Sequence, residues 1–172
     1  MRVVALCGSL RAESSNRLLL RAAARLAPAG MEFTEYDELG LLPHFNPDLE
    51  PGPPAVARLR DLLAGADGLV ISSPEYAHGI PGALKNALDW LVADPRVAGL
   101  PVILLNASAA GGDRAQAALV EVLRTMSLEV LAGASQLVAF LPRKLTAGAP
   151  LDPAPARALQ ASLAALAQAR RR

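Results

Sequence analysis

The 172-residue chain contains one cysteine, few aromatic residues and no excess of charge of either sign. The single cysteine, Cys7, excludes an internal disulfide and any metal site built from cysteine pairs, and it suits a reducing cytoplasm, where we expect the protein to be located. Lysine and arginine total 17 against 16 for aspartate and glutamate, so the basic surplus typical of nucleic-acid-binding proteins is missing. No apolar run reaches the roughly 18 residues of a membrane-spanning helix, and we expect no association with a membrane.

Apolar residues make up 52% of the chain and aromatic residues only 3%, so the core is expected to consist of alanine, leucine and valine. The length suits one domain, residues 1–172, which is large enough to bury roughly 70% of its unfolded surface. The N-terminal string MRVVALC has a short apolar run and no cleavage site of small residues. It therefore predicts a first strand rather than a signal peptide.

Apolar runs of strand length alternate with segments of helical periodicity along the chain. This alternation predicts successive strand-helix-strand units and a parallel sheet. The segment 100–108 is the most apolar of the runs and is expected to be a central strand. The five expected strands lie at 2–7, 31–37, 67–73, 100–108 and within 129–140.

If the five strands are wound in the order 2-1-3-4-5, the direction of winding switches between the first and the third strand. Ligands of such sheets bind outside the carboxyl ends of the strands at this switch point. The order therefore predicts a site formed by three loops, GSLRAESSN (8–16), SPEYAHGIPG (73–82) and NASAAGGD (106–113).

The first of these loops combines small hydroxyl residues, one arginine and a helix start. Ser14 or Ser15 can cap the helix, whose free N–H groups and positive dipole end favour an anion. Arg11 adds a bidentate ligand for a phosphate. An ordinary capped helix beside a solvated arginine is the alternative interpretation. The location at the expected switch point favours an anion-binding site.

Two familiar phosphate-binding motifs, the Walker loop and GxGxxG, do not occur in the chain. A cysteine phosphatase is a further alternative, because Cys7 ends the first strand and a thiolate there is a potential nucleophile. That chemistry needs an arginine at the position of Glu13, whose negative charge repels phosphate, and Arg11 lies too close to Cys7 to replace it. We therefore expect Cys7 to be a small buried residue.

The second loop is stiffened by Pro74 and Pro81 and allows close approach of a ligand at Gly79 and Gly82. A planar aromatic ligand suits such a backbone, with Tyr76 as a wall of the pocket. A rigid strand-to-helix connection is the alternative interpretation, since proline and glycine occur in loops of every kind.

The third loop places Ser108, Gly111 and Gly112 beside the same crevice, and Asp113 is expected to cap the helix that follows.

Other polar and aromatic residues are expected to have structural roles. Lys85 and Asp89, four residues apart, predict a surface ion pair. Trp90 is expected in packing or in a contact between subunits. His44 and His78 have no partner at the spacing of metal ligands and are expected to face solvent, and no metal site is predicted.

The strings GSLRAESSNRLLLRAAARL, LPHFNPDLE and SPEYAHGIPGALKNALDWL together resemble, in order and spacing, the NADPH-dependent FMN reductase family. This family comprises flavodoxin-like flavoproteins that include bacterial quinone, chromate and azo-dye reductases. The resemblance covers about the first 130 of the 172 residues, and the remainder of the chain is generic. It implies a flavodoxin-like α/β fold, a three-layer sandwich around a five-stranded parallel sheet of order 2-1-3-4-5.

The resemblance also implies a function. The protein is expected to pass a hydride from NADPH or NADH, by way of bound FMN, to a flavin, quinone, azo compound or metal oxyanion in a ping-pong mechanism. No catalytic side chain is expected, because the flavin itself carries the hydride. Relatives form homodimers or homotetramers, so an oligomer is expected.

Ten residues match positions that bind FMN in the resembled family. The first loop is implied to hold the phosphate, and the second loop, largely through its backbone, lines the flavin ring beside the third. Ala77 and His78 follow the PEY triplet, where many relatives have asparagine. The resemblance therefore does not identify the electron acceptor that the protein prefers. The implied cofactor-binding residues are Ser9, Arg11, Ser15, Asn16, Pro74, Glu75, Tyr76, Ser108, Gly111 and Gly112.

Two other functions remain compatible with the flavin interpretation. One is a flavodoxin-like carrier of single electrons, although such carriers are typically very acidic and this chain has a net charge of +1. The other is a flavin-binding sensor without NAD(P)H activity.

Overall fold

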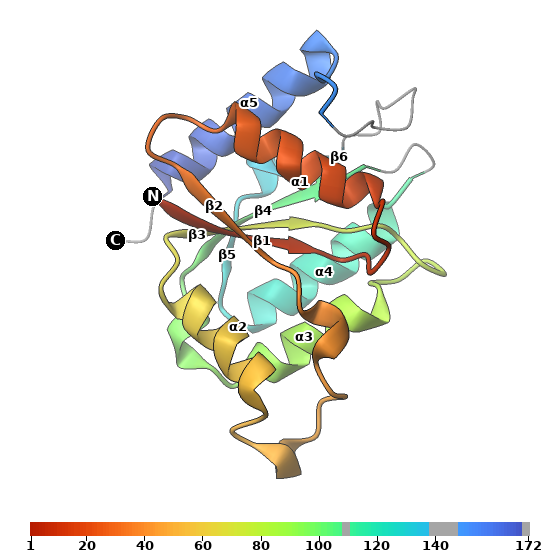
Figure 1. Cartoon of the computed structure of the whole chain (residues 1–172), viewed down its shortest axis with the longest axis vertical. Helices are drawn as coiled ribbons and strands as arrows, with labels where there is room; N and C mark the ends of the chain where they lie inside the picture. Colours follow the sequence, from red (N-terminus) through yellow and green to blue (C-terminus); the bar gives the residue numbers. More distant parts are fainter. Residues whose placement is uncertain (108–110, 138–147, 170–172) are drawn as a thin grey trace.

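A parallel β-sheet forms the middle layer of the computed structural model, which describes residues 1–107, 111–137 and 148–169 (Figure 1). The strand order is β2-β1-β3-β4-β5, and β6 pairs with β4 as well. The predicted α/β class and the order 2-1-3-4-5 are therefore confirmed. The strands are β1 (Arg2–Cys7), β2 (Glu32–Tyr36), β3 (Gly68–Ser72), β4 (Pro101–Asn106), β5 (Glu129–Val130) and β6 (Gln136–Leu137).

Helices cover both faces of the sheet. Figure 1 shows α1 and α5 on one face and α2, α3 and α4 on the other. Successive side chains of a strand point to opposite faces, so Val3 and Ala5 of β1 pack with α1 and α5, whereas Val4 and Leu6 pack with the other three helices. The helices are α1 (Ser15–Leu26), α2 (Pro54–Ala64), α3 (Gly82–Leu91), α4 (Asp113–Thr125) and α5 (Pro153–Gln168).

The fifth strand, expected within 129–140, is correct in position but not continuous. A 3₁₀ turn at Ala132–Ala134 separates β5 from β6, and both pieces pair with β4. Alanine and glycine at the interruption have low β-propensity. The Ser135 hydroxyl replaces a ladder bond there, because it accepts from Leu104 N at 3.1 Å and donates to Leu131 O at 3.0 Å. Residues 138–140 lie outside the described part of the chain.

A long proline-rich loop connects β2 to α2 and is attached to α3. The Nε1 of Trp90 and the Nδ2 of Asn86 both donate to Pro43 O, at 2.9 Å each. The Trp90 ring also meets Phe45 edge-on at a centroid distance of 5.1 Å. Trp90 is fully buried, so its role within the chain is packing.

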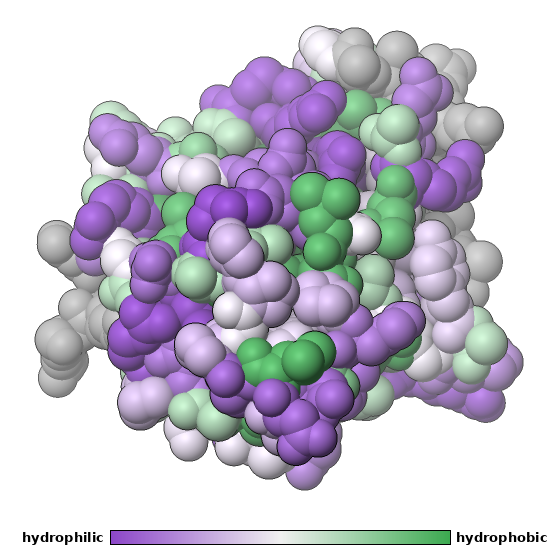
Figure 2. Space-filling model, turned by 60° about the horizontal axis from the view of Figure 1, so that its bottom comes forward, coloured by the Kyte–Doolittle hydropathy of each residue, from purple (hydrophilic) through white to green (hydrophobic). Residues whose placement is uncertain are grey.

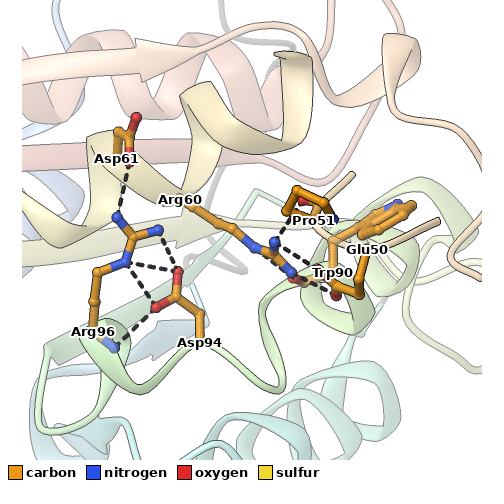
Figure 3. Close-up of polar contacts among 7 residues, drawn as sticks. All are labelled: Glu50, Pro51, Arg60, Asp61, Trp90, Asp94 and Arg96. Atoms are coloured by element: carbon orange, nitrogen blue, oxygen red, sulfur yellow. Dashed lines mark hydrogen bonds and ion pairs between the residues drawn. The ribbon is translucent and has the colours of Figure 1, made fainter. Parts of the chain in front are cut away.

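Two arginines extend this attachment to α2 (Figure 3). Arg60 of α2 donates to the Glu50 carboxylate at 2.8 and 2.9 Å and to the carbonyls of Pro51 and Trp90. Arg96 joins Asp94 to Asp61 in the same way. Glu50 and Pro51 of the loop are thus held by Arg60, and Asp94, after α3, is held by Arg96. No described helix is long and apolar enough to cross a lipid bilayer.

Candidate cofactor-binding site

The three predicted loops meet at one edge of the sheet. Parallel pairing aligns Cys7 of β1 with Ser72 of β3, and Ser72 with Leu105 of β4, so the loops after these strands start side by side. Gly8 N donates to Ser72 O at 2.8 Å, and Ser73 N donates to Leu105 O at 3.1 Å. The predicted convergence of the loops at the switch between β1 and β3 is confirmed.

The first loop carries a buried hydroxyl and an exposed guanidinium shortly before the first residue of α1. Ser9 is only 2% exposed, and its Oγ accepts from Arg11 N at 3.3 Å and lies 3.4 Å from the Tyr76 phenol oxygen. The Arg11 side chain is exposed, and within the described residues its guanidinium has no protein partner. A charged donor in the segment before α1 is therefore not used by the described part of the fold.

The N-terminus of α1 is not capped by a side chain. Ser14 occupies the N-cap position, but its hydroxyl makes no capping hydrogen bond, which differs from the cap expected of Ser14 or Ser15. The Ser14 carbonyl accepts the first helical bond, from Leu18 N. The N–H groups of the first helical turn thus keep their hydrogen-bonding capacity and partial positive charge, as a phosphate site requires.

Asn16, in the first turn of α1, is used partly for structure. Its Oδ1 accepts from Ser72 Oγ at 2.8 Å and from Ala107 N at 3.1 Å, and the residue is 5% exposed. The side-chain oxygen thus ties α1 to the ends of β3 and β4. Only the donors of Asn16 are suited to the phosphate contact that the resemblance implies.

Cys7 is buried as predicted, with an exposed fraction of 1%. Burial raises the pKa of its thiol. The thiol donates a hydrogen bond to the Ser9 carbonyl oxygen, with a distance of 3.5 Å from Sγ to that oxygen. A protonated, buried thiol is a poor nucleophile, which removes the basis of the phosphatase interpretation.

The second loop contains a tight two-residue turn. Tyr76 and Gly79 exchange two backbone hydrogen bonds, of 3.1 and 2.9 Å, around Ala77 and His78. Both central residues have positive φ, 48° at Ala77 and 62° at His78. Asparagine and glycine are the residues that favour this conformation, so Ala77 is strained.

Glu75 has a side-chain role that the sequence did not predict. Its Oε2 accepts from Ala115 N at 2.9 Å, and its Oε1 lies 3.1 Å from His78 Nδ1. These contacts, first the Ala115 amide and then His78, lower the pKa of the carboxyl group. The expected capping of α4 by Asp113 is wrong, since Gly112 is the N-cap residue and Asp113 the first helical residue.

The third loop brings its backbone close to the strand end. Gly111 and Gly112 have φ of 109° and 144°, which residues with a side chain rarely adopt. A Cβ at Gly112 would overlap Nδ2 of Asn106, the atom that donates to Gly111 O at 3.4 Å. Ser108 lies outside the described residues.

Lys85, Asp89 and the two histidines lie where the sequence predicts them. Lys85 Nζ and Asp89 Oδ1 form a half-exposed ion pair at 2.6 Å. His44 and His78 are exposed. Within residues 1–107, 111–137 and 148–169, no three histidine, cysteine or acidic side chains gather as a metal site would need.

This arrangement defines an α/β protein of the flavodoxin type, with an uncapped helix start where the first strand meets its helix. An NADPH-dependent FMN reductase family model matches residues 1–140. A quinone reductase from Escherichia coli is 40% identical over 130 residues, which are 72% of this chain and 69% of that protein. An NAD(P)H-dependent FMN reductase from Pseudomonas aeruginosa is 38% identical over 122 residues, 67% of this chain and 65% of that protein.

The solved structure of FerB, a flavoenzyme NAD(P)H:(acceptor) oxidoreductase from Paracoccus denitrificans, is similar over 97% of this chain and 95% of its own. The TM-score is 0.87 and the identity 29%. The chain therefore belongs to the NADPH-dependent FMN reductase family, a family of NAD(P)H-dependent oxidoreductases.

The residues at the site fit the FMN that this family implies. The open first turn of α1, the Ser9 hydroxyl and the unused Arg11 guanidinium are donors suited to a phosphate. Gly111 and Gly112 expose backbone that a planar ring system can approach closely.

Proposed function

We propose that this protein is an FMN-dependent reductase that oxidises NADPH or NADH and reduces a quinone, a flavin or a similar small acceptor. The observation that carries the proposal is the uncapped start of α1 beside Ser9 and Arg11, at the switch point of a sheet of this family. Quinone reductases and FMN reductases among its relatives support the choice of acceptors.

In this proposal, the chain binds and orients the cofactor. The N–H groups of the first turn of α1, with Ser9 and Arg11, hold the FMN phosphate. The backbone of the second and third loops lines the flavin ring, beside Tyr76. Bound FMN supplies hydride transfer, so the site needs no acidic or basic side chain of its own. Backbone N–H groups in a polar site of this kind stabilise negative charge without reorganisation.

The proposal includes ping-pong kinetics, in which the nicotinamide leaves before the acceptor binds. Initial rates are measured over a range of NADPH concentrations at several fixed quinone concentrations. Double-reciprocal plots against NADPH should then give parallel lines. Intersecting lines would show a ternary complex and contradict this part of the proposal. Rates with FMN, a quinone, an azo dye and chromate rank the acceptors.

The decisive experiment is the visible spectrum of the purified protein, followed by anaerobic titration with NADPH. We expect a flavin spectrum, prompt bleaching by NADPH or NADH, and recovery of colour when a quinone is added. Colourless protein that takes up no added FMN contradicts the proposal. A flavin spectrum that NADPH and NADH leave unchanged favours the electron carrier or the sensor.

We also propose that the protein is a homodimer or homotetramer in the cytoplasm, from the resemblance to its family and its single cysteine. Trp90 does not contribute to a subunit contact, because it is fully buried inside the chain. Figure 2 shows apolar side chains in small separate areas of a mainly hydrophilic face. Sedimentation at micromolar concentration tests the assembly, and a purely monomeric profile would rule it out.

A further inference from the structure

The start of α4 cannot be capped by its own residue. Gly112 stands at the N-cap position, where serine, aspartate or asparagine usually accepts a first-turn N–H group. Its φ of 144° and the contact of a would-be Cβ with Asn106 restrict the position to glycine. The first-turn amides of α4 therefore need an acceptor from another part of the chain.

Glu75, from the second loop, supplies this acceptor. Its carboxylate accepts from Ala115 N, 40 residues away in sequence, and only 19% of its side chain is exposed. A negative charge at a helix N-terminus is favoured by the helix dipole as well as by the hydrogen bond. The second and third loops are thus joined by a charged contact.

The other carboxylate oxygen of Glu75 holds the turn that follows it. It lies 3.1 Å from Nδ1 of His78, one of the two strained residues of the turn. In the sequence, Tyr76 lies between Glu75 and the turn residues Ala77 and His78. Its phenol oxygen is 3.4 Å from Ser9 Oγ of the first loop. One carboxylate therefore contacts both the start of α4 and the turn that carries Tyr76.

We propose that Glu75 is a positioning residue, which makes the second loop and the start of α4 move as one unit beside the flavin. This inference rests on the proposed function and deepens it. Glu75 acts through Tyr76 and the loop backbone, because both carboxylate oxygens are engaged within the protein. The family resemblance implies that Glu75 contacts the cofactor largely through its backbone, and the geometry assigns its side chain to the coupling of the second loop with the start of α4.

Hydrogen-deuterium exchange of the flavin-free protein tests the coupling. Glu75→Ala should accelerate exchange severalfold in both segments, 74–80 and 112–118. Glu75→Gln, which keeps the shape and one acceptor, should do so less and guards against misfolding of the alanine variant. Glu121→Ala removes an exposed carboxylate from the same helix and should change neither segment. Acceleration confined to 112–118 would show a simple helix cap and overturn the proposal.

The FMN-loaded protein tests the effect on the site. Glu75→Ala should bind FMN about tenfold more weakly, the size of one charge-assisted hydrogen bond. At saturating FMN it should show altered visible circular dichroism and a higher KM for NADPH, with Glu75→Gln intermediate. A saturated Glu75→Ala protein with unchanged spectrum, KM and kcat overturns this inference alone. A parent protein that binds no FMN, or that NADPH does not bleach, overturns the proposed function and this inference together.

Discussion

Helices α1 and α4 begin at the same edge of the sheet, yet their N-termini have opposite surroundings. At α1 the residue at the cap position, Ser14, makes no capping bond, and the Arg11 side chain beside it is unused by the fold. At α4 the cap position is a glycine, and the Glu75 carboxylate reaches across from another loop. A helix start attracts anions wherever it lies. This chain thus closes one helix start with its own charge and leaves the other without a side-chain cap.

The largest expected effect is at the start of α4. Gly112→Ala should lower the free energy of unfolding by about 2 to 3 kcal/mol, because the positive φ is strained for alanine and the new Cβ displaces Asn106. Urea unfolding measures the change. Gly133→Ala is the matched control, since a Cβ there meets nothing within 4 Å, and it should stay within about 0.5 kcal/mol. Equal stability of the two variants would show that the α4 start is not constrained as described.

The second effect is at the open start of α1. Arg11→Ala should weaken FMN binding by about 1.5 to 3 kcal/mol, the contribution of a charge-assisted hydrogen bond, and leave the stability of the flavin-free protein unchanged. Fluorescence titration with FMN measures the affinity. Arg25→Ala removes the same charge from the last turn of α1 and should bind FMN normally. Full retention of flavin by Arg11→Ala through desalting would exclude this residue from the phosphate site.

The third prediction concerns the charge that closes α4. The Ala115 amide and His78 hold the pKa of Glu75 below its ordinary value, so its carboxylate stabilises the fold fully above about pH 4.3. This contribution is lost as the pH falls through the lower pKa of the folded state. The stability difference between the parent and Glu75→Gln should thus be constant near neutrality and shrink in acid. Urea unfolding at several pH values checks it, and a difference that grows in acid has the wrong sign.

The smallest expected effect is at the cap position of α1. An N-cap serine usually contributes about 1 kcal/mol, but Ser14→Ala should change the stability of the flavin-free protein by less than about 0.5 kcal/mol. Asn46→Ala is the control, because the Asn46 side chain does accept from Asp48 N, at 3.0 Å, and should cost more. A larger loss for Ser14→Ala than for Asn46→Ala would show that α1 is capped after all.

Much of the fold was predictable because its signal is local. The buried strands β1, β3 and β4 are short, almost wholly apolar runs, and α1 and α4 carry apolar residues at helical spacing. The interruption between β5 and β6 was not predictable. It depends on Ser135 bonding to Leu104 of the neighbouring strand, which no local pattern reveals.

The candidate site also has a part that was predictable from the sequence and a part that was not. The three loops were predictable, since the carboxyl ends of adjacent parallel strands share one edge. The partners of individual side chains were not: Asn16 and Glu75 bond to groups far away in the sequence, and Asp113 is not the cap of α4. One clue was present for Glu75, because a helix that starts after two glycines lacks a cap of its own.

The sequence by itself determined the alternation of strands and helices, the family, and the three segments that start side by side at the candidate site. These follow from side-chain periodicity and from residues close together in the chain. Only the tertiary structure decided which helix start stays open and which is closed by Glu75. That choice depends on hydrogen bonds between residues 40 or more positions apart, and their geometry exists only after the sheet has brought its loops together.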